Sequence, residues 1–112
     1  MIRENVRSDS QTSITAPFAG QTFQQKNGMV TLGFKGTTKE EDQFEVIIYD
    51  NLSKSFDNDY RVLNAVLKKT PDDKGFKLSF NLKVELKQGL YYYIIRKKDN
   101  TDIIYVSKFF VK

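Results

Sequence analysis

The fold of this chain is decided by one stretch, Leu86-Lys87-Gln88-Gly89-Leu90-Tyr91-Tyr92-Tyr93-Ile94. In sandwiches of two β-sheets, a tyrosine near the start of a strand turns its hydroxyl back onto the preceding corner. Leu86 is predicted to close the open end of such a sandwich, and Gly89 to make the bend. Tyr92 is predicted to hydrogen-bond the corner backbone, with Ile94 on the same, inward face. The stretch therefore predicts a tyrosine corner.

The same spacing resembles the fibronectin type III form of this corner, Leu-x-Pro-Gly-x-x-Tyr-x-Val, with Gln88 where proline is usual. The resemblance is local and implies an immunoglobulin-like (Ig-like) sandwich. The chain has neither the tryptophan nor the cysteine pair of true immunoglobulin domains. The alternative is three tyrosines in an ordinary edge strand, because aromatic residues favour strands in any case.

Short alternating apolar runs separated by turn residues occupy the rest of the chain from Ser13 onward. The clearest run is 76–84, where Phe76, Leu78 and Phe80 alternate with polar residues. The predicted strands are 13–18, 29–35, 43–50, 60–69, 76–84, 90–97 and 102–112. Segment 60–69 also fits a short helix, but the turn residues at 70–75 favour a hairpin. We predict an all-β, Ig-like sandwich of about seven antiparallel strands.

The domain organisation is simple. Residues 1–12 show no periodicity and are predicted to be a flexible arm, which leaves 13–112 as one sandwich domain. No apolar run approaches the ~18 residues of a membrane span, and the start lacks the apolar stretch of a signal peptide. The cellular location is left open.

Composition removes several functional classes. The chain contains no cysteine and no histidine, so Ser-His-Asp and Cys-His catalysis cannot occur within it. No phosphate-binding glycine loop or metal-ligand pattern is present, and we expect neither a cofactor nor a metal. The net charge is +4, and the excess falls within residues 83–112, around Arg96-Lys97-Lys98. A single basic triplet favours a solvated hairpin tip over a nucleic-acid site.

The predicted corner also assigns the strand faces. Tyr92, Ile94 and Leu90 should point inward, together with Phe44, Val46 and Ile48 of the preceding apolar strand. Because neighbouring residues alternate between faces, the remaining apolar residues of both strands should form an outward patch. That predicted protein interface consists of Ile47, Tyr49, Tyr91, Tyr93 and Ile95. Alternatively, residues 1–25, or a helix at 60–69, cover this face internally.

A second resemblance concerns function. The runs Gly89-Leu90-Tyr91-Tyr92-Tyr93-Ile94 and Lys108-Phe109-Phe110-Val111 resemble the closing strands of the N-terminal module of phage upper baseplate proteins. The resemblance implies a non-enzymatic virion component of a baseplate, tail or head fibre. Its partners would be other protein subunits, including copies of itself, held by the arm or the tyrosine face. The alternative is a carbohydrate-binding or cell-surface adhesion module, with tyrosines stacking on sugars.

Overall fold

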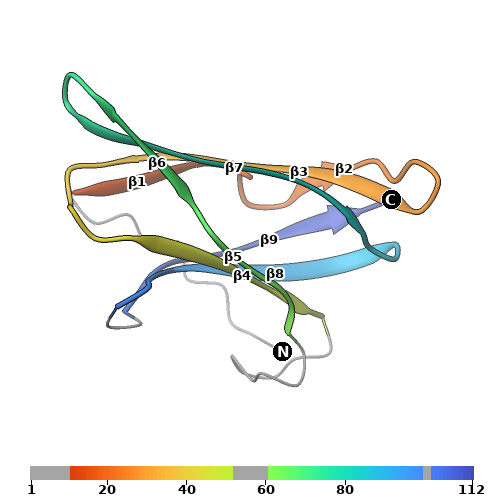
Figure 1. Ribbon diagram of the computed structural model, residues 1–112. Coiled ribbons are helices and arrows are strands. Elements are labelled where there is room, and N and C mark those ends of the chain that lie inside the picture. Colours follow the sequence, from red (N-terminus) through yellow and green to blue (C-terminus); the bar gives the residue numbers. More distant parts are fainter. Residues whose placement is uncertain (1–10, 52–60, 100–101) are drawn as a thin grey trace.

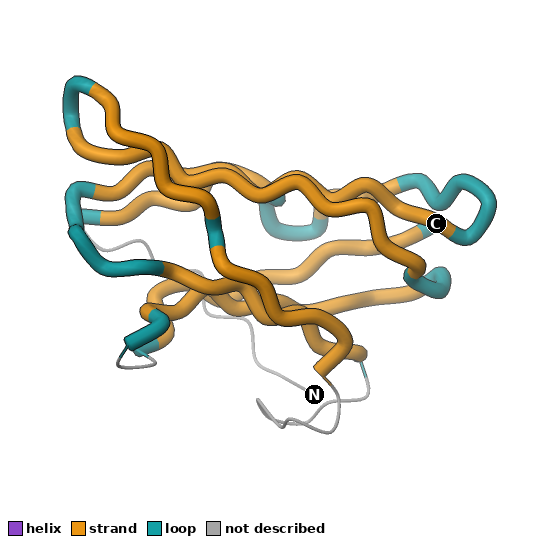
Figure 2. The backbone as a smooth tube through the Cα atoms, viewed as in Figure 1, coloured by secondary structure: helices purple, strands orange, loops and turns teal. Residues whose placement is uncertain are grey.

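The computed structural model describes residues 11–51, 61–99 and 102–112, and every regular element in these ranges is a β-strand (Figure 1). The strands are β1 (Thr12–Ala16), β2 (Gln21–Phe23), β3 (Met29–Thr38), β4 (Phe44–Asp50), β5 (Arg61–Val66), β6 (Lys68–Asp72), β7 (Gly75–Glu85), β8 (Gly89–Lys97) and β9 (Ile103–Val111). The tube in Figure 2 shows them as two layers. The prediction of an all-β sandwich is confirmed.

The order of the strands is that of an Ig-like sandwich. One sheet has the order β1-β3-β7-β6 and the other β2-β9-β8-β4-β5. With β1 as strand A, the first sheet reads A-B-E-D, and β9-β8-β4 in the second reads G-F-C. As predicted, β4 and β8 are neighbours, and β9 lies beside β8. The short strands β2 and β5 are additions that extend the second sheet.

The chain passes from one sheet to the other at both sides of the sandwich. On one side, a cis peptide bond between Ala16 and Pro17 separates β1 from β2, which then pairs in parallel with β9. On the other side, Leu67 separates β5 from β6, and its backbone N–H donates to Phe44 O over 2.9 Å. Within the described residues 61–69 the predicted β conformation is confirmed and the helix alternative is wrong, but the single predicted strand is two strands in different sheets. Tyr60 and the first ten residues of the predicted arm lie outside the described residues.

The core lies between the sheets. Aromatic rings from both sheets meet there: Phe34 of β3 packs edge to face against Tyr93 of β8, with ring centroids 5.2 Å apart. Tyr91 stacks on Phe109 of β9 at 5.5 Å. Such pairs contribute about 0.5–1.5 kcal/mol beyond the area that they bury. The inner faces of β3, β8 and β9 are thus joined by a continuous layer of side chains.

One glycine lets β1 approach β3 closely. A side-chain carbon at Gly36 would lie 2.6 Å from the backbone oxygen of Ser13, closer than such atoms approach in real structures. Ile14 pairs with Gly36, and the register then shifts before Ala16. Glycine at this position is therefore required by the packing of two backbones.

Strands β4 and β8 are buried on both faces. Phe44 to Tyr49 are all buried, and so are Tyr91 to Ile95. Their inner-facing residues join the core between the sheets, whereas a second group forms a separate apolar cluster on the outer face. This outer cluster consists of Ile47, Tyr49, Tyr92, Ile94 and Val106, with Leu90 packed against it. Continuous burial explains why β4 and β8 are apolar runs without the polar alternation of β7.

Candidate binding surfaces

The five residues predicted to form an exposed interface are all buried. Ile47 and Tyr49 do lie on the outer face, as predicted, but within the buried outer cluster. Tyr91, Tyr93 and Ile95 lie in the core between the sheets, with at most 7% of each residue exposed. Their predicted outward orientation is wrong. A protein interface made of these five side chains is therefore not on the surface of the described structure.

The physical reason is the pairing of β8 with β4. Residues directly opposite each other in a sheet point to the same face. Ile95 lies opposite Val46 and Tyr93 lies opposite Ile48, and both β4 residues were correctly predicted to point inward. Since side chains alternate with a period of two, a shift of one residue reverses every assignment along the strand.

The tyrosine corner is present, but Tyr91 makes it. The Tyr91 hydroxyl donates to the backbone oxygen of Lys87 over 2.8 Å, four residues upstream. Leu86 is buried in the core, and Gly89 adopts a φ of 149° just before Tyr91. The prediction that Tyr92 makes the corner is wrong by one position. Tyr92 and Ile94 instead belong to the outer cluster.

The environment of Tyr91 also changes its acidity. Burial raises the pKa of its phenol above the usual value of 10.0, and the nearby Asp50 carboxylate raises it further. The hydrogen bond to the Lys87 backbone acts in the opposite direction, because it lowers the pKa. Asp50 is opposite Tyr91 in the β4–β8 ladder, which accounts for the charge effect. The corner hydroxyl is therefore held in its neutral, donating form.

The connection between β1 and β2 is held in place by several hydrogen bonds. The buried Tyr93 hydroxyl donates to Pro17 O over 2.5 Å, which joins the core of β8 to this connection. Gly20 N donates to Lys108 O on β9, and Gln21 N donates to Phe18 O, each over 3.0 Å. The turn from Phe18 to Gln21 is consequently anchored at both ends to the five-stranded sheet.

Exposed apolar side chains lie on this anchored turn and on the strands β9 and β8 of the five-stranded sheet. Phe18 is 63% exposed, the largest value among the exposed large hydrophobic residues that the structure describes. Phe110 of β9 is 36% exposed, and a side-chain carbon at Gly20 would lie 4.0 Å from its ring. Leu90 lies opposite Phe110 on β8 and is partly exposed. We call Phe18, Leu90 and Phe110 the kink margin, after the cis Ala16–Pro17 bond that precedes Phe18.

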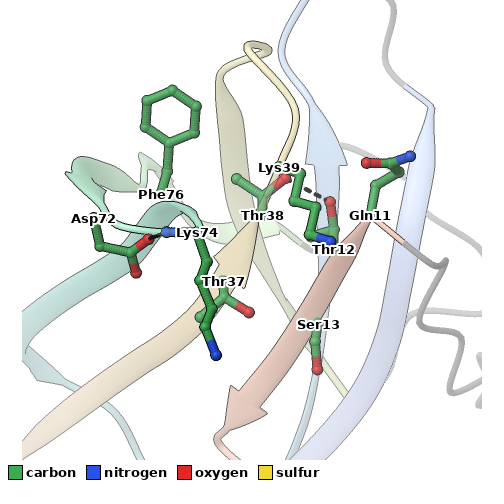
Figure 3. Close-up of a pocket in the computed structure, with 9 residues that line it drawn as sticks. All are labelled: Gln11, Thr12, Ser13, Thr37, Thr38, Lys39, Asp72, Lys74 and Phe76. Atoms are coloured by element: carbon green, nitrogen blue, oxygen red, sulfur yellow. Dashed lines mark hydrogen bonds between the residues drawn. The ribbon is translucent and has the colours of Figure 1, made fainter.

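A depression of about 240 Å³ lies where the start of β1, the end of β3 and the β6–β7 turn meet (Figure 3). It is lined by Gln11, Thr12, Ser13, Thr37, Thr38, Lys39, Asp72, Lys74 and Phe76. The hydroxyls of Thr12 and Thr38 share a hydrogen bond of 2.8 Å, and Thr12 also donates to Glu40 Oε2. The Thr12 and Thr38 hydroxyls therefore bond within the protein and link β1 to β3.

The basic triplet Arg96-Lys97-Lys98, predicted to lie at a solvated hairpin tip, has part of its charge neutralised by carboxylates. Arg96 Nε donates to Glu45 Oε1 over 2.5 Å, and Lys97 Nζ donates to Glu40 Oε1 over 2.7 Å. Lys97 also lies 3.7 Å from an oxygen of Asp42. Two of the three cations are thus held by carboxylates on neighbouring segments. This arrangement leaves little unpaired charge in the triplet for a phosphate backbone.

Comparisons with known proteins support the fold alone. No protein-family model matches the sequence, and no curated protein is recognisably similar to it. In structure, the chain is similar to part of a hypothetical protein from Parabacteroides merdae, with a TM-score of 0.51 and 10% sequence identity. The match covers 99% of this chain and 34% of that protein, so the chain spans about a third of its length.

Among the residues that the structure describes, no three acidic side chains come together in a group that could hold a metal ion. The same ranges contain no helix long and apolar enough to cross a membrane.

Proposed function

We propose that the protein is a non-enzymatic assembly module that contacts other protein subunits through the kink margin. The observation that carries this proposal is an exposed aromatic residue on a fixed support. Phe18 projects from a turn whose backbone is bonded to β9 and whose preceding carbonyl is bonded to Tyr93. Aromatic side chains dominate the binding energy of many interfaces, and a preorganised support lowers the entropic cost of association.

The margin has the features of a contact site. Phe110 and Leu90 lie opposite each other in the β8–β9 ladder, and the Phe110 ring approaches the turn at Gly20. Several exposed apolar side chains in one region are more informative than scattered single residues, which occur on every protein. The more specific role of a phage virion component is proposed on the motif resemblance of Gly89–Ile94 and Lys108–Val111 alone.

The test is assembly in the native source. We expect the tagged wild-type chain to co-sediment with an assembly much larger than its 13.0 kDa. Phe18→Ser combined with Phe110→Ser should sediment as free chain while retaining the wild-type melting temperature within a few degrees. Thr31→Ser, an exposed position on β3, is the matched control and should remain in the assembly. A wild-type chain that sediments alone, or a double variant that still assembles, would overturn the proposal.

Carbohydrate binding is the second candidate, and the depression beside β1, β3 and the β6–β7 turn is the observation that favours it. Tyr91 and Tyr93 cannot stack on sugars, because both are buried in the core. Phe76 lines the depression together with the hydroxyl-bearing Ser13 and Thr37, and Lys69 Nζ lies 4.2 Å from the Phe76 ring centroid. Titration of a glycan panel against the wild type and Phe76→Ala tests this candidate. Binding that survives Phe76→Ala would exclude the depression.

A further inference from the structure

The four edges of the two sheets differ in how they are protected against pairing with another chain. Edge strand β6 carries Lys68, Lys69 and Pro71, which hinder the addition of a further strand. Edge strand β1 has an irregularity between Ile14 and Ala16, and β2 is only three residues long. Edge strand β5 (Arg61–Val66) has six residues, one charge and no proline, and its register against β4 shifts between Leu63 and Arg61. In the part of the chain that the structure describes, β5 is the longest of the four edge strands, and its pairing with β4 is regular from Leu63 to Val66.

No strand of the described residues pairs with the outer edge of β5. Leu67 N donates to Phe44 O, so Leu67 and Phe44 form a hydrogen-bonded pair of the antiparallel β4–β5 ladder. This pair fixes which residues of β5 direct their backbone groups toward β4. In such a ladder, residues whose backbone groups face the partner strand alternate with residues whose groups face away. By this alternation Ala65 faces β4, whereas the N–H and C=O groups of Asn64 and Val66 are directed outward. These groups are available to a further strand.

The side chains at the edge are suited to a strand of the same sequence. Val62 is 41% exposed and Val66 is 43% exposed, although both are β-branched and apolar. If two β5 strands pair antiparallel about a twofold axis at Asn64, Val62 of each copy lies opposite Val66 of the other. The two Asn64 residues then face each other, and Arg61 lies opposite Leu67. No like charges oppose each other in this register, and two apolar pairs are formed.

We propose that two copies of the chain pair antiparallel through β5, which joins their five-stranded sheets into one continuous sheet. The partner is a second copy because the edge is self-complementary about Asn64, as a twofold interface requires. Backbone hydrogen bonds supply the association, and the two Val62–Val66 contacts select the register. This contact uses the opposite edge of the five-stranded sheet from β2, and it goes beyond the function proposed for the kink margin.

The first experiment measures the mass of the full chain by light scattering after size exclusion, over a concentration series reaching about 1 mM. We expect a concentration-dependent dimer of twice 13.0 kDa. Val62→Lys with Val66→Lys should weaken dimerisation at least about tenfold, because two pairs of like charges then oppose each other. Val62→Thr with Val66→Thr is the matched control, which keeps β-branched side chains and should still dimerise. A wild-type chain that remains monomeric throughout the series overturns the proposal.

Two further variants keep the proposal falsifiable if the lysine variant does not fold. Asn64→Pro removes an N–H that is directed away from β4, so it should leave the monomer folded and abolish the dimer. The chain has no cysteine, so Asn64→Cys introduces a unique thiol at the twofold axis. Under mild oxidation it should form a disulfide-linked dimer, and the exposed control Lys83→Cys on β7 should not. Equal cross-linking of the two cysteine variants contradicts the proposal.

The outcome is separable from that of the proposed function. Phe18→Ser with Phe110→Ser changes the kink margin and leaves β5 intact, so the purified double variant should dimerise normally. The β5 variants leave the kink margin intact. A dimer lost only in the kink-margin variant would place the self-contact at that margin and overturn the pairing through β5.

Discussion

Three adjacent tyrosines in β8 should respond very differently to the loss of a single hydroxyl. Tyr91 donates to Lys87 O at the corner, and Tyr93 donates to Pro17 O in the buried connection between β1 and β2. For Tyr92, no hydrogen bond of the hydroxyl is found within the described ranges, although its ring is buried in the outer cluster. The substitutions Tyr91→Phe, Tyr92→Phe and Tyr93→Phe therefore remove one oxygen from three different environments.

The expected costs follow from the acceptor that each hydroxyl leaves behind. Lys87 is exposed, so water can replace the lost donor, and Tyr91→Phe should cost about 1 kcal/mol of the free energy of unfolding. Pro17 is buried, so its carbonyl stays unsatisfied in Tyr93→Phe, and the cost should be about 1–3 kcal/mol. Tyr92→Phe should change stability by less than about 0.5 kcal/mol.

The assay is equilibrium unfolding in urea, followed by circular dichroism, on the wild type and the three variants. A cost of 1 kcal/mol corresponds to a fall of about 4 °C in the melting temperature of a domain of this size, which gives an independent check. The denaturant dependence should be the same in all four proteins, because the buried surface hardly changes. If Tyr92→Phe were the most destabilising of the three, Tyr92 would make the corner and the register described for β8 would be refuted.

Other predictions concern pH, backbone contact and charge. Burial, and next the Asp50 carboxylate, raises the pKa of Tyr91 in the folded state. The contribution of Tyr91 to the free energy of unfolding should therefore be fully present below about pH 10, and it should be lost as the pH rises through the folded-state pKa. Tyr91→Phe should flatten this fall in unfolding curves measured between pH 9 and 12. Gly36→Ala should cost about 1–3 kcal/mol, since the new carbon would lie 2.6 Å from Ser13 O. Gly33→Ala, which meets only the Asn81 side-chain oxygen at 3.2 Å, should cost clearly less in the same denaturation series. Arg96→Met should cost more than the ~1 kcal/mol of an exposed ion pair, because it leaves the carboxylate of Glu45, a residue only 7% exposed, without this cation. Adding Glu45→Gln should recover part of the loss, which a double-mutant cycle measures.

Much of the architecture is local in origin, and local patterns predicted it. The alternation of Phe76, Leu78 and Phe80 with polar residues belongs to an amphipathic strand that covers one side of the core. The turn residues at 70–75 favoured a strand over a helix for the preceding segment, and the structure has β5 and β6 there. Each of these features depends on residues a few positions apart, so a single sequence contains the information.

The candidate surfaces depended on information that no short stretch contains. Strand β8 is apolar on both faces, so the run Leu90–Ile95 has no alternation that distinguishes inside from outside. The kink margin likewise combines Phe18 with Leu90 and Phe110, which are far apart in the sequence. The turn that carries Phe18 is held beside β9 by the bond from Gly20 N to Lys108 O and by the parallel pairing of β2 with β9.

By itself, the amino-acid sequence determined the class of fold, the position of the corner at Gly89 and the exclusion of histidine- and cysteine-dependent catalysis. Tertiary structure alone decided that Tyr91, not Tyr92, closes the corner, and with it the face of every residue in β8. The physical reason is the two-residue period of a strand. A run that is apolar on both faces satisfies burial equally well in either orientation, and only its pairing with β4 and β9 selects one of them.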